Sequence, residues 1–468
     1  MLFNSFIFIF LFLPFVFLLY YLLNQYKLYK IAIVLLVFSS LFFYAWWKPE
    51  YLPIIIISLF FNYIIGFYLS KKKICQSLKK YILIFGIMSN VSLLIYFKYT
   101  DFLLFNFNFL FGTHFSLPHL TLPLAISFFT FQQIAYLVDS YRGQTKEYDF
   151  LNYSLFVTFF PQLIAGPIVH HKEMMPQFQN INNTTLQFSN IILGIFIFTM
   201  GLFKKVMIAD TFSKWATQGF DVAEKLNFFE AWCTSLSYTF QLYYDFSGYT
   251  DMAIGTALLF NIRLPFNFNS PYKAVNIQDF WRRWHITLSR FLRDYIYIPL
   301  GGNRDTEIKV YRNIIITFLI GGIWHGAGWT FLIWGLLHGI ALVIHRIWSS
   351  FHIKLHTIFA WFITFMFINF TWIFFRAKSW NDAQKVLDGM TSIPFTLSIH
   401  VNSLHGIGGN FSTYLWLGIV FVTTVFFNNT NTISIKHLSS RNTVIIAFLF
   451  ILSVYHLTDV SEFLYFNF

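Results

Sequence analysis

Residues 2–23 read LFNSFIFIFLFLPFVFLLYYLL, and this stretch decides the structural class because it carries no charged side chain. A helix of about 20 predominantly apolar residues crosses the hydrocarbon core of a bilayer. The stretch exceeds the apolar core of a typical signal peptide, and neither a basic segment nor a small-residue cleavage site accompanies it. We therefore expect a retained first transmembrane helix.

Similar apolar runs recur along the rest of the 468 residues. They lie near residues 31–48, 51–70, 81–98, 121–140, 150–168, 187–208, 228–260, 311–349, 355–375, 411–427 and 443–460. Hydrophobic residues make up 57% of the chain and charged residues 11%, which is too little charge to coat a water-soluble protein of this length. We predict an all-α, polytopic transmembrane helical bundle of about 11 spans plus amphipathic or re-entrant helices, forming a single domain over residues 1–468.

The net charge of +12 would suit a nucleic-acid-binding protein, but the Lys and Arg residues lie mostly between the apolar runs, where cytoplasmic loops collect them. Lys27 and Lys30 follow the first run, and five lysines between residues 71 and 80 follow the third. We expect no nucleic-acid partner, a surrounding lipid bilayer and an extracytoplasmic N-terminus. Cys75 and Cys233 are the only cysteines, so neither a disulfide framework nor a cysteine metal site is indicated.

Two runs, 228–260 and 311–349, are longer than one crossing and carry Gly, Asp, Ser or His in their middles. This pattern predicts helices that are interrupted within the membrane. Such interruptions are tolerated only where protein or a cavity satisfies the freed backbone groups. We therefore expect the functional site in the middle of the chain.

Residues 278–295, QDFWRRWHITLSRFLRDY, predict one amphipathic helix. Its apolar side chains fall in a single arc, with the charged and polar ones opposite. One interpretation is a surface helix at the lipid headgroups, anchored by Trp and Arg. The other is ligand binding, because a narrow polar stripe could hold an anionic ligand such as the phosphates of coenzyme A. The stripe consists of Arg282, His285, Ser289 and Arg293.

Residues 320–339, IGGIWHGAGWTFLIWGLLHG, place His325 among glycines inside an apolar run. A lone histidine on an apolar helix is more often a hydrogen-bonded packing residue, and we interpret His338 in this way. His325 differs because the adjacent glycines allow close approach, and an ionisable residue within a membrane is a functional candidate. His325 is therefore a candidate catalytic residue. We interpret His170 and His171, in a predicted loop, as solvated.

Residues 241–253, QLYYDFSGYTDMA, place Asp245 and Asp251 in an apolar run. Buried acids need partners, and Arg or His residues of the amphipathic helix are the expected ones. Acid–base work or a cation site is the alternative, but the aromatic surroundings are a weak metal signal, and we expect no metal.

Six stretches of the chain are far more specific than any short motif. They are FFPQLIAGPI (159–168), YDFSGYTDMAIG (244–255), NFNSPYKA (267–274), DFWRRWHITLSRFLRDYIYIPLGGNR (279–304), GGIWHGAGWTFLIWG (321–335) and WIFFRA (372–377). Together they resemble the membrane-bound O-acyltransferases, specifically the bacterial branch that contains the membrane subunits of alginate and peptidoglycan O-acetyltransferases. The resemblance covers most of the chain.

The resemblance implies roles for individual residues. His325 matches the histidine regarded as catalytic in that family and His285 matches its second signature histidine, so we expect both to be catalytic. We expect substrate-binding roles for Arg282, Ser289, Arg293, Trp324 and Asp245. The implied fold is a ring of tilted helices around a central tunnel.

The resemblance also implies an activity. Acetyl groups from cytoplasmic acetyl-CoA would cross the bacterial cytoplasmic (inner) membrane, without a bound cofactor, for O-acetylation of a cell-envelope polysaccharide. A secreted or periplasmic O-acetyltransferase partner is expected, because no loop here is large enough to be that domain. Peptidoglycan is slightly favoured over alginate or another exopolysaccharide, because the composition indicates an AT-rich genome.

Three alternatives remain open. A related branch transfers D-alanine from a carrier protein to teichoic acid, but it lacks the IPLGGNR continuation at residues 298–304. A small-molecule transporter also places ionisable residues and broken helices at the membrane midplane, although no repeated half is visible here. A scaffold for cell-envelope enzymes would leave His325 dispensable.

Overall fold

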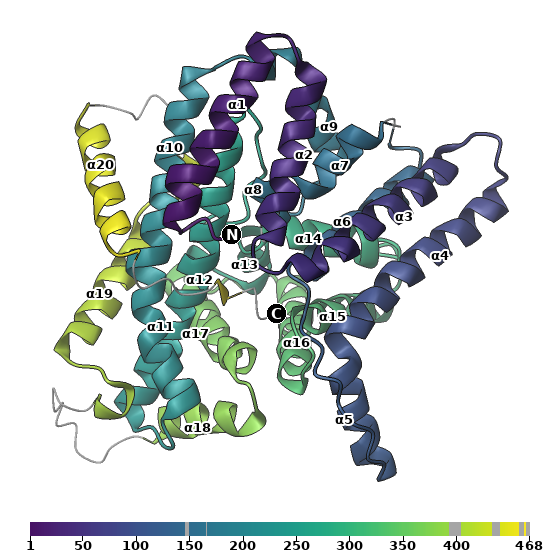
Figure 1. Ribbon diagram of the computed structural model, residues 1–468. Helices are drawn as coiled ribbons and strands as arrows, with labels where there is room; N and C mark the ends of the chain where they lie inside the picture. Colours follow the sequence, from purple (N-terminus) through teal and green to yellow (C-terminus); the bar gives the residue numbers. More distant parts are fainter. Residues whose placement is uncertain (146–148, 165, 393–403, 433–439, 458–462, 465–468) are drawn as a thin grey trace. The chain divides into compact units, whose positions relative to one another are not determined.

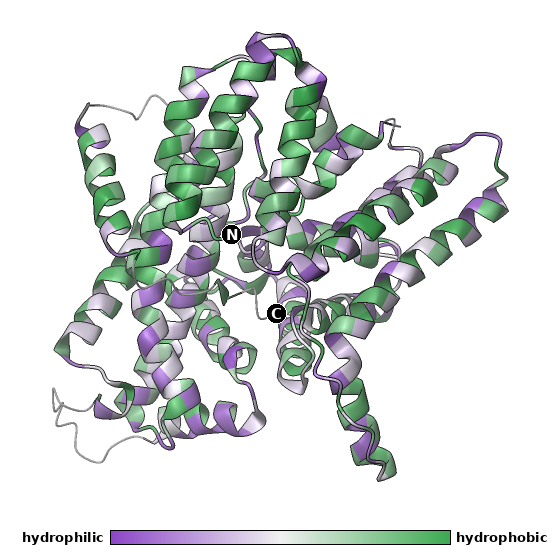
Figure 2. Cartoon of the chain, viewed as in Figure 1, coloured by the Kyte–Doolittle hydropathy of each residue, from purple (hydrophilic) through white to green (hydrophobic). Residues whose placement is uncertain are grey.

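A computed structural model describes residues 1–145, 149–164, 166–392, 404–432, 440–457 and 463–464. Every regular element in these residues is a helix (Figure 1). The predicted all-α class is therefore confirmed. Hydrophobic residues predominate along α1 (Leu13–Gln25), α2 (Tyr29–Ala45) and α10 (Phe188–Phe203), as Figure 2 shows.

Helices long and apolar enough to cross a bilayer number 7 in the described residues. They are Phe8–Gln25, Pro49–Ser70, Gln76–Phe111, Phe188–Val222, Trp329–Ser350, Thr357–Arg376 and Phe411–Thr432. Two shorter apolar helices, Tyr29–Ala45 and Arg441–Tyr455, add to these. The protein is thus a multi-pass membrane protein, while the total of about 11 spans stays a prediction.

The chain divides into two compact units. Unit 1 contains the described parts of residues 1–202, 249–265 and 434–467, and unit 2 contains those of residues 203–248 and 266–433. Each unit is considered by itself. The ring of helices, the central tunnel and the single domain over the whole chain stay predictions.

Unit 1 is built from apolar helices joined by a few polar contacts. Helix α3 (Leu52–Ser70) packs against α4 (Gln76–Leu94) and α6 (Ile126–Tyr141). The amides of Asn62 and Asn90 exchange hydrogen bonds of 3.1 and 2.7 Å between α3 and α4. Such pairs satisfy polar side chains where neither water nor lipid can do so.

The two histidines interpreted as solvated are buried in unit 1, so that prediction was wrong. His170 and His171 are 5% and 4% exposed. His170 Nδ1 lies 3.9 Å from Asp139 Oδ2, and the His171 ring contacts the rings of Tyr136 and Phe156. Helix α9 (His171–Phe178) begins here and packs against α7 (Phe150–Thr158), which removes both imidazoles from solvent. Burial lowers the pKa of His171 to about 4.

The run 228–260 forms one unbroken helix, α12 (Phe228–Leu259), so the predicted interruption there was wrong. At 1.5 Å per residue its 32 residues extend about 48 Å. Its polar side chains find lateral partners. Lys205 Nζ lies 2.7 Å from Asp245 Oδ1, and Lys204 Nζ donates to Ser247 Oγ at 3.0 Å. The backbone therefore needs no break to accommodate them.

The run 311–349 does break, as predicted, into α15 (Glu307–His325) and α16 (Trp329–Ser350). The two helices lie in close contact because glycines face each other. A Cβ at Gly322 would clash with the carbonyl oxygen of Phe331, and one at Gly335 with that of Phe318. Small residues permit this backbone approach in membrane helices. The break places His325 at the end of α15.

Candidate active site

The predicted helix over residues 278–295 is divided at His285, so its continuity was predicted wrongly. The structure has α13 (Ile277–Arg283) and α14 (Ile286–Leu292), followed by a π-helical turn at Arg293–Tyr297. His285 has φ 41° and ψ 54°, the left-handed conformation. A non-glycine residue pays about 1–3 kcal/mol for such a conformation, so surrounding contacts must impose it.

Asn267 supplies those contacts. Its carbonyl oxygen accepts from the Ile286 N–H at 3.0 Å. Its side-chain Oδ1 accepts from the N–H and the hydroxyl of Thr287 at 3.3 and 2.6 Å. The NFNSPYKA stretch thus caps α14 and holds the turn at His285.

The turn directs His285 into unit 2 and away from the polar stripe. His285 is 0% exposed. Its ring lies edge-on to Phe246 of α12, with centroids 4.7 Å apart, and 6.3 Å from the ring of Trp324. The helical wheel had placed His285 beside Arg282 and Ser289, which would require the helix to continue through it.

His325 is enclosed by aromatic rings. Its ring centroid lies 4.9 Å from that of Trp324, 5.1 Å from that of Trp334 and 5.0 Å from that of Phe375. Trp334 belongs to α16 and Phe375 to α17 (Thr357–Arg376). The side chain is 3% exposed. Because Trp324 contacts both histidines, the structure brings His285, Trp324 and His325 together.

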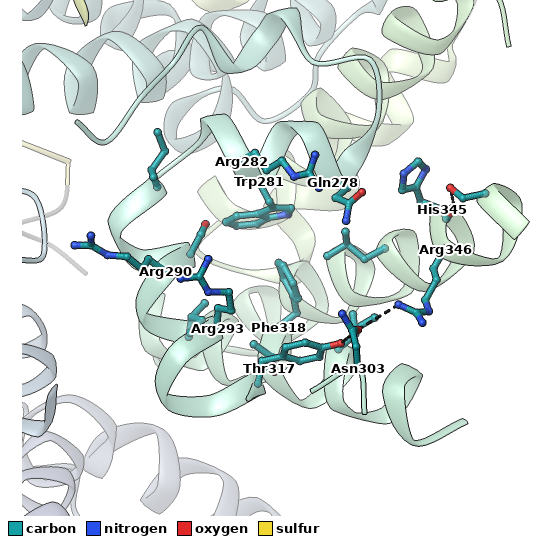
Figure 3. Close-up of a pocket in the computed structure, with 17 residues that line it drawn as sticks. Gln278, Trp281, Arg282, Arg290, Arg293, Asn303, Thr317, Phe318, His345 and Arg346 are labelled. Carbon is teal, nitrogen blue, oxygen red and sulfur yellow. Dashed lines mark hydrogen bonds between the residues drawn. The ribbon is translucent and has the colours of Figure 1, made fainter. Parts of the chain in front are cut away.

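A cavity of about 650 Å³ lies in the same unit (Figure 3). Arg282, Ser289 and Arg293 of the predicted polar stripe line it. Arg290 and Arg346 also line it. Arg290 lies on the polar side of the predicted helix and could have been included. Arg346 comes from α16, and the only sequence signal for it was an ionisable residue near the end of an apolar run.

The cavity carries an excess of positive charge. Its described lining includes four arginines and no carboxylate. Arg293 pairs with Asp294 at 2.7 Å and Arg346 with Glu307 at 3.2 Å, and the hydrogen bond from Arg346 lowers the pKa of the Glu307 carboxyl. Arg282 forms no ion pair with a carboxylate among the described residues. Several guanidinium groups gathered around one cavity suit the oxygens of a phosphate group.

Asp245 does not line this cavity among the described residues. It is 1% exposed and pairs with Lys205 of the π-helical segment Lys204–Ala209, and Lys205 also contacts Asp210 at 2.9 Å. The interpretation of Asp245 as a paired buried acid is confirmed. The expected partner was wrong, because a lysine lies opposite it rather than an Arg or His of the amphipathic helix.

The model of the family described as MBOAT, membrane-bound O-acyltransferase, matches residues 139–380, which include both candidate histidines and the cavity arginines. This chain belongs to the membrane-bound O-acyltransferase family. It is therefore an acyltransferase, as the resemblance predicted. Family membership favours an enzyme over a transporter or a scaffold. The individual roles of His285 and His325 stay predictions.

This membrane-bound O-acyltransferase is similar to three relatives of different named activity. A peptidoglycan O-acetyltransferase of Helicobacter pylori is 52% identical over 423 residues, 84% of this chain and 80% of that protein. A probable alginate O-acetylase AlgI of Pseudomonas aeruginosa is 40% identical over 398 residues, 84% and 75% of the two chains. A teichoic acid D-alanyltransferase of Streptococcus thermophilus is 26% identical over 239 residues, which cover 48% of this chain and 57% of that protein.

Proposed function

We propose that this protein is an O-acetyltransferase that carries acetyl groups from cytoplasmic acetyl-CoA across a bacterial cytoplasmic membrane for O-acetylation of a cell-envelope polysaccharide. The observation that carries the proposal is the arginine-lined cavity in the same unit as the enclosed His325. Peptidoglycan is the favoured polymer, because the relative that is 52% identical bears that name.

The cavity suits the donor in size and chemistry. Its volume of about 650 Å³ lies within the range of small-molecule sites. Arg282 and Arg290 offer guanidinium groups to the phosphates of coenzyme A. Trp281 and Phe318 add an apolar wall for the uncharged part of the donor.

His325 would perform the transfer. Its imidazole accepts the proton of an acceptor hydroxyl, and the hydroxyl oxygen bonds to the thioester carbonyl carbon. The carbon–sulfur bond then breaks, and the proton passes to the leaving thiolate to give coenzyme A. In the alternative route His325 itself carries the acetyl group between donor and acceptor. The surrounding aromatic rings would exclude water, which otherwise hydrolyses the thioester.

The acceptor would be a Ser, Thr or Tyr hydroxyl on a secreted or periplasmic partner O-acetyltransferase, which passes the acetyl group to the polymer. His285 would shape the donor side together with Trp324. The N-terminus would be extracytoplasmic, as the lysine-rich loops indicate.

Radiolabelled acetyl-CoA tests the proposal with purified protein in detergent, with and without the candidate partner. We expect wild-type protein and His114→Ala, a control at an exposed histidine, to release coenzyme A and to label the partner. His325→Ala should fold but transfer no label. Full activity in His325→Ala would refute its catalytic role.

D-alanyl transfer is the second candidate, because the Streptococcus thermophilus relative aligns over 48% of this chain. A D-alanyl-loaded carrier protein supplied in place of acetyl-CoA distinguishes the two. Label transfer from the carrier alone would favour this candidate over acetylation.

A further inference from the structure

His338 is a buried histidine for which the proposed reaction has no use. It lies on α16, four residues after Trp334, and is 0% exposed. Both ring nitrogens lie within hydrogen-bonding distance of a partner. Trp281 Nε1 donates to Nδ1 at 3.2 Å, and Nε2 lies 3.1 Å from Thr371 Oγ1. The interpretation of His338 as a hydrogen-bonded residue is thus confirmed.

The partners determine how the imidazole is oriented and protonated. An indole N–H can only donate, so Nδ1 must accept and carries no proton. The Thr371 hydroxyl donates its one hydrogen to the carbonyl oxygen of Ile368 at 2.9 Å. Nε2 therefore donates to Thr371, and His338 is the neutral Nε2–H tautomer. The other neutral tautomer would place an Nδ1–H against the indole N–H, so that two donors would face each other.

His338 contacts two parts of the candidate active site. Trp281 stands in the wall of the arginine-lined cavity (Figure 3). Trp334 has its ring centroid 4.7 Å from His338 and 5.1 Å from His325. The Trp281 and Trp334 rings are themselves 5.9 Å apart. One imidazole thus holds the cavity wall by a hydrogen bond and supports the ring behind His325 by packing.

We propose that His338 is a positioning residue that keeps Trp281 in the cavity wall and Trp334 against His325. In this way it aligns a bound acyl donor with His325. This inference rests on the proposed function of the cavity and of His325. It predicts that the two contacts of His338 affect different kinetic constants, KM and kcat. The hydrogen bond to Trp281 governs donor binding, and the packing on Trp334 governs the transfer step.

Four variants separate these two contacts. His338→Phe keeps a ring against Trp334 but removes the acceptor for Trp281, and Trp281→Phe removes the donor of the same bond. We expect either change to raise the KM for acetyl-CoA about tenfold with kcat little changed, the size of one buried hydrogen bond. The double variant should be no worse than either single one. His338→Asn keeps an acceptor for Trp281 and loses the ring, so kcat should fall while KM stays near the wild-type value.

Thr371→Val is the control, because it removes the other hydrogen bond of His338 without touching Trp281. A purely structural role for His338 predicts that Thr371→Val and His338→Phe lose thermal stability alike and leave KM unchanged. That result, or additive effects of His338→Phe and Trp281→Phe on KM, would overturn the proposal.

A second readout needs no acetyl-CoA. In protein labelled with 5-fluorotryptophan, the ¹⁹F resonance of Trp281 is the one missing from Trp281→Phe. It should shift in His338→Phe and stay in place in Thr371→Val, and an unmoved resonance in His338→Phe would count against the contact. Wild-type protein that consumes no acetyl-CoA would instead overturn the proposed function, and the resonance would then still report whether His338 holds the indole.

Discussion

Replacing Lys205 with Met tests the buried charge cluster of Lys205, Asp210 and Asp245, which lies beside the unbroken helix α12. The Lys205 and Asp245 side chains are 3% and 1% exposed, and their charged atoms lie 2.7 Å apart. Asp210, 13% exposed, lies 2.9 Å from the same ammonium group. Removing the lysine leaves both carboxylates without this cation in a poorly solvated site. Breaking a buried pair in this way costs about 3–5 kcal/mol.

Equilibrium unfolding in mixed micelles measures this loss of free energy. Lys385→Met is the matched control, because Lys385 donates to the carbonyl oxygens of Phe220 and Ala223 and its removal isolates no carboxylate. The double variant Lys205→Met with Asp245→Asn should recover part of the loss, since one of the two isolated charges disappears. If Lys205→Met costs no more than Lys385→Met, the pair does not stabilise the fold as argued.

Three further outcomes are expected. Arg282→Gln should raise the KM for acetyl-CoA about tenfold or more, because it removes a charge-assisted hydrogen bond. Transfer assays measure this KM, and an unchanged value would contradict the prediction. Gly335→Ala should cost about 1–3 kcal/mol of stability because its Cβ meets the Phe318 carbonyl, whereas Gly418→Ala, with open space around it, should not. His171 has a folded pKa of about 4 against 6.5 unfolded, so stability is complete above pH 6.5 and falls as the pH drops toward 4, by about 2 kcal/mol at pH 5. Thermal unfolding of His171→Phe should lack that dependence, and an equally steep curve would exclude His171 as its source.

The sequence singled out most of the side chains that the structure brings to the candidate site, but it predicted their positions only in part. Arg282, Ser289 and Arg293 of the predicted stripe line one cavity. Ser289 and Arg293 are four residues apart, a spacing that brings side chains to one helix face, whereas Arg282 lies beyond the break at His285. His285 was misplaced because the helix stops there. The hydrogen bonds that Asn267 accepts from Thr287 join residues 20 positions apart, and no local pattern reveals them.

Asp245 shows the same limit. Its need for a cation followed from the cost of an uncompensated charge in an apolar run. The sequence offers several basic residues that could pair with the Asp245 carboxylate. Lys205 is the partner because of how its segment packs against α12.

The amino-acid sequence by itself determined that this chain is helical and crosses a membrane, that its apolar run 311–349 is interrupted, and that it belongs to an acyltransferase family. The helical and membrane-crossing character is local, because lipid obliges each apolar run to satisfy its own backbone hydrogen bonds. Tertiary structure alone decided the left-handed turn at His285, the lateral pairing of Asp245 and the entry of Arg346 into the cavity. Each of these depends on contacts between segments distant in the chain, whose energies outweigh local preference only once the helices have packed.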